Sequence, residues 1–127
     1  MYLLDTHYLI WMTCDPDKLS PKAADLITNE NNNVYFSAAS IFEIEIKKSI
    51  GKLDVPDQFA QGLRDSGLEE LPILSAHAEN LSDLPSIHKD PFDRMLIAQA
   101  LEEKMILVTQ DHAILQYQSH YAKIISC

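Results

Sequence analysis

The chain has 127 residues and a formal net charge of −9, and 46% of its side chains are hydrophobic. This composition excludes an intrinsically disordered chain, and the acidic balance argues against a general nucleic-acid-binding protein, which would be basic. No apolar run approaches the roughly 20 residues of a membrane span, and no signal peptide is evident. We therefore expect a cytoplasmic protein without membrane association, folded as a single domain over residues 1–127.

Five apolar segments predict short strands. The segment over residues 2–5 lacks polar alternation, which favours a central place in a parallel sheet. The segment over residues 68–74 is interrupted by Glu69, Glu70 and Pro72, which indicates an edge strand. The other strands are expected at residues 34–36, 105–109 and 123–126.

Helices are predicted between these strands, and several begin with capping residues. Ser20 and Pro21 form a typical N-cap and first helical residue, and Ser75 is expected to cap another helix. The predicted helices cover residues 9–12, 21–29, 39–50, 57–65, 75–84 and 91–104, with a short one around residues 114–117. This alternation predicts an α/β fold, a three-layer α/β/α sandwich with a central, mostly parallel sheet of about five strands.

The helix over residues 39–50 carries two side-chain patterns. Phe42, Ile46 and Ile50 recur at i, i+4 and i+8 and therefore share one face. Glu43 and Lys47 share another face, where a surface salt bridge worth about 0.3–0.5 kcal/mol would explain both. We find no apolar stripe that is clearly left over for an interface.

The helix that begins at Pro91 has an acid on each side of its Pro-Phe pair. Asp90 is placed to cap this helix, and Asp93 lies in its first turn, where the helix dipole favours a negative charge. Capping alone would explain both acids. The positions of the other acids in the chain favour a catalytic role instead.

Four acids are predicted to meet at one edge of the sheet. Asp5 ends the first strand, Glu43 lies in the first turns after the second strand, and Asp111 follows the fourth strand. Asp93 begins a helix that runs back toward the start of the fourth strand, so it belongs to the same edge. Parallel α/β folds place their functional site beyond the carboxyl ends of the strands, so the four acids form a candidate catalytic cluster.

Clustered carboxylates need compensation, because two like charges ~4 Å apart repel by about 4 kcal/mol at an effective dielectric constant near 20. A protein with only oxygen ligands favours Mg²⁺ or Mn²⁺. Such an ion can bind a phosphodiester and activate water for hydrolysis. Zinc is not expected, because the five histidines show no ligand spacing, and we interpret them as surface or packing residues with His7 and His112 adjoining the site.

Basic residues near the helix starts are candidates to hold the phosphates of a substrate. Lys47 and Arg94 are the two that we assign to substrate binding. For each of them singly, a solvated surface charge is an equally good explanation.

These motifs resemble those of the PIN-domain nucleases, specifically the VapC-type toxins of type II toxin–antitoxin systems. The matching segments follow the family order across essentially the whole chain. They are Leu4-Asp5-Thr6-His7, Ser37-Ala38-Ala39-Ser40-Ile41-Phe42-Glu43-Ile44, Gly51-Lys52-Leu53, His88-Lys89-Asp90-Pro91-Phe92-Asp93-Arg94-Met95-Leu96-Ile97-Ala98-Gln99-Ala100 and Thr109-Gln110-Asp111.

The resemblance implies a Mg²⁺- or Mn²⁺-dependent endoribonuclease with an RNA substrate, a homodimer, and a small antitoxin protein that blocks the site. It assigns the acidic site to Asp5, Glu43, Asp93 and Asp111. We expect Asp5, Asp93 and Asp111 to be metal ligands and Glu43 to be a ligand or to orient the attacking water. The supporting residues are expected to be Thr6, Ser37, Asp90 and Thr109.

Two other functions are consistent with parts of this pattern. A phosphatase with Asp5 as nucleophile would need a second carboxylate two residues later, where His7 stands instead. A non-catalytic module that uses the same fold to bind a protein would be favoured by a broken acidic set, but this set is complete.

Overall fold

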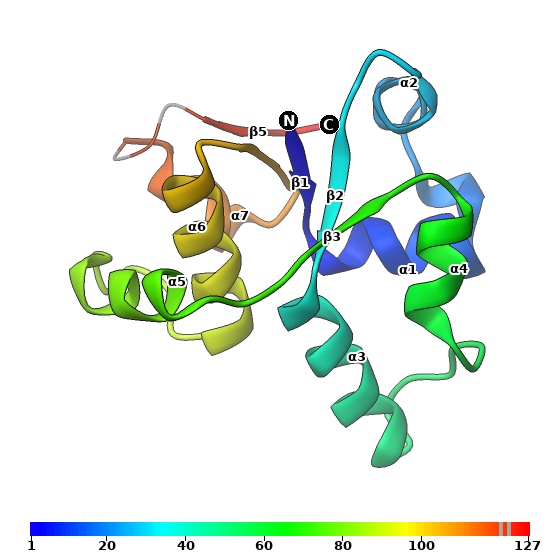
Figure 1. The fold of residues 1–127 in the computed structure, drawn as a ribbon, viewed down its shortest axis with the longest axis horizontal. Coiled ribbons are helices and arrows are strands. Elements are labelled where there is room, and N and C mark those ends of the chain that lie inside the picture. Colours follow the sequence, from blue (N-terminus) through cyan, green and yellow to red (C-terminus); the bar gives the residue numbers. More distant parts are fainter. Residues whose placement is uncertain (120, 122) are drawn as a thin grey trace.

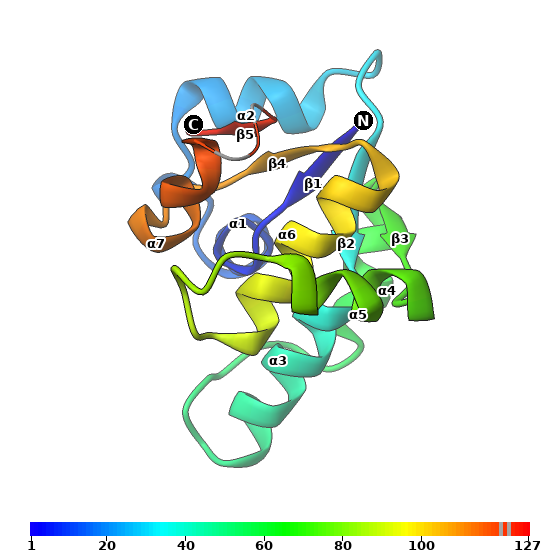
Figure 2. The same ribbon diagram turned by 90° about the vertical axis from the view of Figure 1, so that its left-hand side faces the viewer.

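The fold has helices on both sides of a central sheet, as Figures 1 and 2 show from two directions. The computed structural model describes residues 1–119, 121 and 123–127. Within these residues, five strands pair in parallel in the order β3-β2-β1-β4-β5. They are β1 (Tyr2–Leu4), β2 (Val34–Ser37), β3 (Glu69–Leu71), β4 (Ile106–Val108) and β5 (Ile124–Ile125). The predicted α/β sandwich and the edge position of β3 are confirmed.

The central strands bury both of their faces, which divides the core in two. Leu3 of β1 lies beside Leu107 of β4, and both pack against α6 and α7. The next pair in register, Leu4 and Val108, packs on the opposite face against α1 and α4. Successive strand residues point to opposite faces, so a strand buried on both sides must be apolar throughout.

The helices follow the predicted segments, with some shifted boundaries. The α-helices are α1 (Thr6–Cys14), α2 (Pro21–Thr28), α3 (Ala38–Ser49), α4 (Phe59–Asp65), α5 (Ser75–Glu79), α6 (Pro91–Glu103) and α7 (His112–Leu115). Short 3₁₀ turns follow at η1 (Pro16–Lys18), η2 (Asn80–Asp83) and η3 (Gln116–Ser119). None of the helices in the described residues is both long enough and apolar enough to cross a membrane.

Most of the predicted caps are present. The Ser20 hydroxyl accepts a hydrogen bond from the amide of Ala23, 3.0 Å away, at the start of α2. Gly51 follows α3 with a φ of 74°, a left-handed conformation that glycine adopts without strain. The prediction for Ser75 is wrong, because Leu74 is the N-cap of α5 and its amide donates to Nδ1 of the buried His77.

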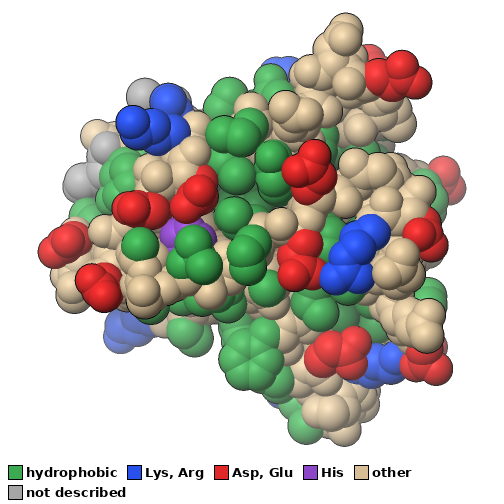
Figure 3. Space-filling view, viewed as in Figure 1, with side chains coloured by type: hydrophobic (Ala, Val, Ile, Leu, Met, Phe, Trp, Pro, Cys, Tyr) green, Lys and Arg blue, Asp and Glu red, His purple; other side chains and the backbone are tan. Residues whose placement is uncertain are grey.

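The apolar face of α3 is exposed. Phe42 is 60% exposed, Ile46 38% and Ile50 60%, so the expectation that no apolar stripe is left over is wrong. Figure 3 shows hydrophobic side chains at the surface over α3, in the lower part of the view. The α3 apolar stripe, defined by these three residues, continues to Phe92 of α6, whose ring meets that of Phe42 edge to face at 5.7 Å.

The chain changes direction at β1, which places the functional edge of the sheet. From β1 it proceeds outward through β2 to β3 and then crosses to β4 on the other side of β1. The carboxyl ends of β1 and β4 are therefore neighbours at the switch point of the sheet. Asp5 directly follows β1, and Thr109 directly follows β4.

A buried side-chain amide connects this edge to the outer helices. Gln99 of α6 is fully buried and accepts a hydrogen bond of 2.5 Å from the Ser37 hydroxyl at the end of β2. Its own amide donates to the carbonyl of Pro72, 3.2 Å away, which follows β3. Gln99 therefore holds α6 in register with both β2 and the segment after β3.

We expect Gln99→Leu to lower the free energy of unfolding by about 2–4 kcal/mol, because the buried Ser37 hydroxyl loses its acceptor and the Pro72 carbonyl loses its donor. Urea denaturation measures this loss. The control is Gln61→Leu on the exposed surface of α4, which we expect to change stability by less than about 0.5 kcal/mol. Equal losses in both variants would contradict this role of Gln99.

Candidate active site

Two adjoining cavities lie at the carboxyl ends of the strands, and the four predicted acids line them. Glu43, Asp93 and Asp111 line a cavity of about 190 Å³. Asp5 and Asp111 line its neighbour, a cavity of about 240 Å³. Asp111 and His7 belong to both. Segments that are far apart in the chain thus bring all four carboxylates to one edge of the sheet.

Asp5 is buried at the end of β1, where it caps α1. Its Oδ1 accepts a hydrogen bond of 2.8 Å from the amide of His7, and its Oδ2 accepts one of 2.5 Å from the Thr109 hydroxyl. Burial raises the pKa of Asp5 above its ordinary value, and the hydrogen bond from Thr109 acts in the opposite direction. The carboxylate is held rigidly at a position where its charge is costly.

Thr109 connects Asp5 to Asp111. While its hydroxyl donates to Asp5, the same oxygen accepts a hydrogen bond of 3.0 Å from the amide of Asp111. Asp111 in turn caps α7 by accepting from the amide of Ala113 at 2.8 Å. One buried side chain therefore sets the relative positions of the acids that follow β1 and β4.

Asp93 lies in the first turn of α6, beside the cap residue Asp90. The Asp90 carboxylate accepts hydrogen bonds from the amides of Phe92 and Asp93, so the predicted capping role of Asp90 is present. Burial raises the pKa of Asp93 to about 6, a hydrogen bond from His88 opposes this, and the charges of Asp90 and Asp111 add to the rise.

Glu43 is buried on α3, and only one of its oxygens is satisfied. Its Oε2 lies 2.6 Å from Nζ of Lys47, so the predicted salt bridge exists within the acidic cavity. Its Oε1 is buried and has no hydrogen-bond partner among the described residues. The hydrogen bond to Glu43 raises the pKa of Lys47, whose side chain is 49% exposed.

The sequence reasoning missed His88. Its Nε2 lies 2.7 Å from Oδ2 of Asp93. One donor atom each of His88, Asp93 and Asp111 lies within 4.8 Å of the others, the one such group of metal-ligating side chains found in the part of the chain that the structure describes. No spacing in the sequence signals this, because His88 precedes α6 in an irregular segment and Asp111 follows β4.

The other supporting residues act on the scaffold. The Thr6 hydroxyl, which lines the smaller cavity, donates to the hydroxyl of Ser40 at 2.9 Å and so connects α1 to α3. Ser37 donates to Gln99, and its oxygen also accepts from the amide of Ala39 at the start of α3. Both residues position the helices that carry the acids.

The assignment of Arg94 to substrate binding needs correction. Its guanidinium donates hydrogen bonds to the carbonyls of Leu81, Pro85 and His88, at 2.8, 3.1 and 3.3 Å, and to the Tyr117 hydroxyl. These bonds hold the segment before α6 against the helix. The sequence could not show this, because each acceptor belongs to the backbone or to a distant residue.

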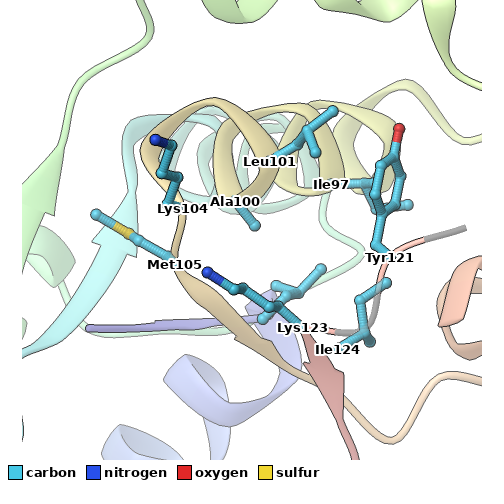
Figure 4. Close-up of a pocket in the computed structure, with 9 residues that line it drawn as sticks. Ile97, Ala100, Leu101, Lys104, Met105, Tyr121, Lys123 and Ile124 are labelled. Carbon is cyan, nitrogen blue, oxygen red and sulfur yellow. The ribbon is translucent and has the colours of Figure 1, made fainter.

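A third cavity differs chemically from the first two. It has a volume of about 400 Å³ and lies between the end of α6 and the strands β4 and β5, as Figure 4 shows. Its walls are mainly apolar, and the charged side chains at its border are Lys104 and Lys123. Among the described residues, no acidic side chain lines this cavity.

The acidic edge of the sheet can be compared with known families. A model of the PIN domain matches residues 2–119 of the chain. The chain belongs to the PIN domain family. Ribonuclease VapC22 of Mycobacterium tuberculosis is 31% identical to this PIN domain over 119 residues, which cover 88% of each protein.

Solved structures share the fold of this PIN domain. VapBC2 from Rickettsia felis, bound to a DNA fragment from its promoter, contains a chain with a TM-score of 0.68 and 18% identity. A toxin–antitoxin complex from Klebsiella pneumoniae gives 0.65 and 16%, and FitAcB from Neisseria gonorrhoeae gives 0.61 and 19%. The Rickettsia match covers 98% of this chain and 97% of the other chain. The Klebsiella match covers 98% and 96%, and the Neisseria match covers 99% and 96%.

The raised pKa of Asp93 predicts a pH-dependent stability of the PIN domain without metal. In the unfolded chain an aspartate has a pKa of about 3.9. The raised pKa of folded Asp93 therefore stabilises the fold fully below that pH, and this stabilisation is lost as the pH rises through about 6. We expect the free energy of unfolding in chelator to fall over that range and Asp93→Asn to reduce the fall. Asp5 contributes in the same direction, so part of the fall remains.

Urea denaturation at several pH values measures this effect. The control is Asp25→Asn, which removes an exposed carboxylate of α2 and should keep the wild-type profile. If Asp93→Asn also keeps the wild-type profile, the raised pKa is not a property of the native protein.

Proposed function

We propose that the chain is a divalent-metal-dependent endoribonuclease that acts as the toxin of a toxin–antitoxin pair. The observation that carries this proposal is the convergence of Asp5, Glu43, Asp93 and Asp111 on two adjoining cavities at the switch point of the sheet. The similarity to Ribonuclease VapC22 supports the choice of RNA as substrate.

The residues present fit a divalent cation. The pKa values of Asp5 and Asp93 are both raised, because these carboxylates are buried where a negative charge is unfavourable. Glu43 adds a buried oxygen without a hydrogen-bond partner among the described residues. A cation at this position would stabilise the buried negative charges and give the Glu43 oxygen a partner. Carboxylate oxygens are ligands that suit Mg²⁺ or Mn²⁺. We propose Asp5, Asp93 and Asp111 as the ligands.

The chemistry proposed is hydrolysis of a phosphodiester. A divalent ion held by these carboxylates would supply positive charge to the phosphate and lower the pKa of water. A water oxygen bonds to phosphorus, the opposite P–O ester bond breaks, and the water's proton passes to solvent through the carboxylates while the leaving oxygen is protonated. Thr109 and the amide of His7 keep Asp5 in one orientation throughout.

Lys47 is the proposed contact to the RNA backbone. Its half-exposed ammonium pairs with Glu43 at the wall of the smaller cavity, so it lies beside the acids that act on the phosphate. The Lys47 ammonium has three donors, so it can bind a substrate phosphate while it stays paired with Glu43. Arg94 is not part of this proposal.

Asp5→Asn is expected to abolish RNA cleavage. An asparagine can still accept from the amide of His7, so the variant should fold, and without metal it should be at least as stable as the wild type because a buried charge is removed. Cleavage of structured and unstructured RNA with Mn²⁺ or with EDTA measures activity. Cleavage by Asp5→Asn equal to that of the wild type would contradict the proposal, and inactivity of the pure wild type would favour a binding module.

Metal should stabilise the wild type in the same preparations. At about 100 times its dissociation constant, Mn²⁺ is expected to add roughly 2.7 kcal/mol to the free energy of unfolding. Thermal melting with and without Mn²⁺ tests this, and Asp5→Asn should respond much less.

We further propose that the α3 apolar stripe forms a homodimer interface and that an antitoxin protein blocks the acidic cavities. A toxin–antitoxin complex among the structural neighbours supports the antitoxin. The exposure of Phe42, Ile46 and Ile50 supports the dimer, because a contiguous apolar patch on a folded domain typically marks an interface. A two-fold dimer would bury the same stripe on both copies.

Phe42→Ser is expected to convert the dimer to a monomer, because it removes the largest exposed side chain of the stripe. Light scattering after size-exclusion chromatography gives the mass directly. Leu101→Ser, at a 41% exposed site on α6 by the third cavity, is the matched control and should remain dimeric. A dimer that survives in Phe42→Ser would place the interface elsewhere.

A further inference from the structure

His88 is positioned by its backbone, independently of its imidazole. Its amide donates to the Tyr117 hydroxyl at 3.1 Å, and its carbonyl accepts from Arg94 at 3.3 Å. Tyr117 itself donates to the carbonyl of Pro85 at 2.6 Å. The segment before α6 is therefore clamped, and the imidazole is presented to the acidic cavity from a fixed point.

Within the described residues, the imidazole makes one hydrogen bond. Its Nε2 lies 2.7 Å from Oδ2 of Asp93, and the side chain is only 21% exposed. Asp111 brings a third donor atom, and all three atoms lie within 4.8 Å of one another. Two ligands of one ion, each about 2.1 Å from it, are at most about 4.2 Å apart, so small side-chain shifts suffice for these atoms to share an ion.

A second observation points to the same place. Glu43 lines the same cavity as His88, Asp93 and Asp111, and its Oε1 is buried without a hydrogen-bond partner among the described residues. The Glu43 residue is only 7% exposed. A buried carboxylate oxygen in that state requires an explanation, and an ion bound at this cavity supplies one.

We infer that His88 is a nitrogen ligand of the catalytic cation, and that the site therefore selects Mn²⁺ over Mg²⁺. This inference rests on the proposed function and changes the ligand set expected from the sequence, which contained only oxygen. Imidazole is a ligand of transition-metal ions, whereas Mg²⁺ is usually bound through carboxylates, phosphates and water. Asp93 then has two roles: it pairs with His88 without metal and binds the ion beside it with metal.

The neighbouring histidines do not have this geometry. The side chain of His7 is 63% exposed, and its Nδ1 lies 3.8 Å from Oδ1 of Asp5. His112 follows Asp111 directly but is exposed on α7. His7 lines both cavities, which makes it the most stringent control for His88.

The experiment is pulsed electron paramagnetic resonance of Mn²⁺ bound to the full chain, with Mn²⁺ and Mg²⁺ affinities from calorimetry. We expect the wild type and His7→Gln to show coupling of the electron spin to a directly bound ¹⁴N, and His88→Gln to lose it. His88→Gln should bind Mn²⁺ at least about 10-fold more weakly, because loss of even an outer-shell partner typically costs that much. His88→Asp, with an oxygen ligand in place of nitrogen, should bind both ions with little preference.

The outcomes separate this inference from the proposed function. Mn²⁺ binding and Asp5-dependent cleavage without ¹⁴N coupling would overturn the role of His88 and leave the nuclease intact. Coupling that is lost in His7→Gln but kept in His88→Gln would assign the ligand to His7. Absence of Mn²⁺ binding by the wild type would overturn both proposals.

Discussion

The structure depends on holding carboxylates together against their mutual repulsion. Asp5 and Asp93 both have raised pKa values because they are buried, and for Asp93 the neighbouring acids add to the effect. The fold offsets this with oriented donors: the Thr109 hydroxyl, backbone amides at helix starts and the Lys47 ammonium. This compensation is incomplete, because one Glu43 oxygen has no hydrogen-bond partner among the described residues. These raised pKa values and this unsatisfied oxygen are the basis on which we propose a cation here.

The scaffold achieves this arrangement through helix starts. Asp5, Asp90 and Asp111 each cap a helix, so the same residues that complete the local structure also direct negative charge to the edge of the sheet. Capping occupies one oxygen of each carboxylate. The second oxygen of Asp5 accepts from Thr109, whereas Asp90 and Asp111 cap through Oδ1 alone. Gln99 bonds α6 to the end of β2 and to the residue after β3, and Arg94 bonds it to the His88 carbonyl. These bonds fix the positions of Asp93 and His88.

The α3 apolar stripe and the third cavity lie at different distances from the acidic cavities. The α3 apolar stripe continues to Phe92. Phe42 is adjacent in sequence to Glu43, and Phe92 is adjacent to Asp93. Anything bound to this stripe therefore lies close to the acidic cavities. The third cavity lies at the far end of α6, where the lining is apolar and the border carries Lys104 and Lys123.

The sequence by itself determined the order of the elements, the caps at Ser20 and Asp90, and the four acids, because strand burial, capping and motif spacing are local properties. Only the tertiary structure decided which donors meet across the chain: Thr109 with Asp5, His88 with Asp93 and Asp111, and Gln99 with Ser37. Only the tertiary structure showed that the α3 face with Phe42 is exposed. Periodicity shows that side chains share a face, but not whether another element covers that face. Arg94 is the same case: its charge is visible in the sequence, and its backbone partners are not.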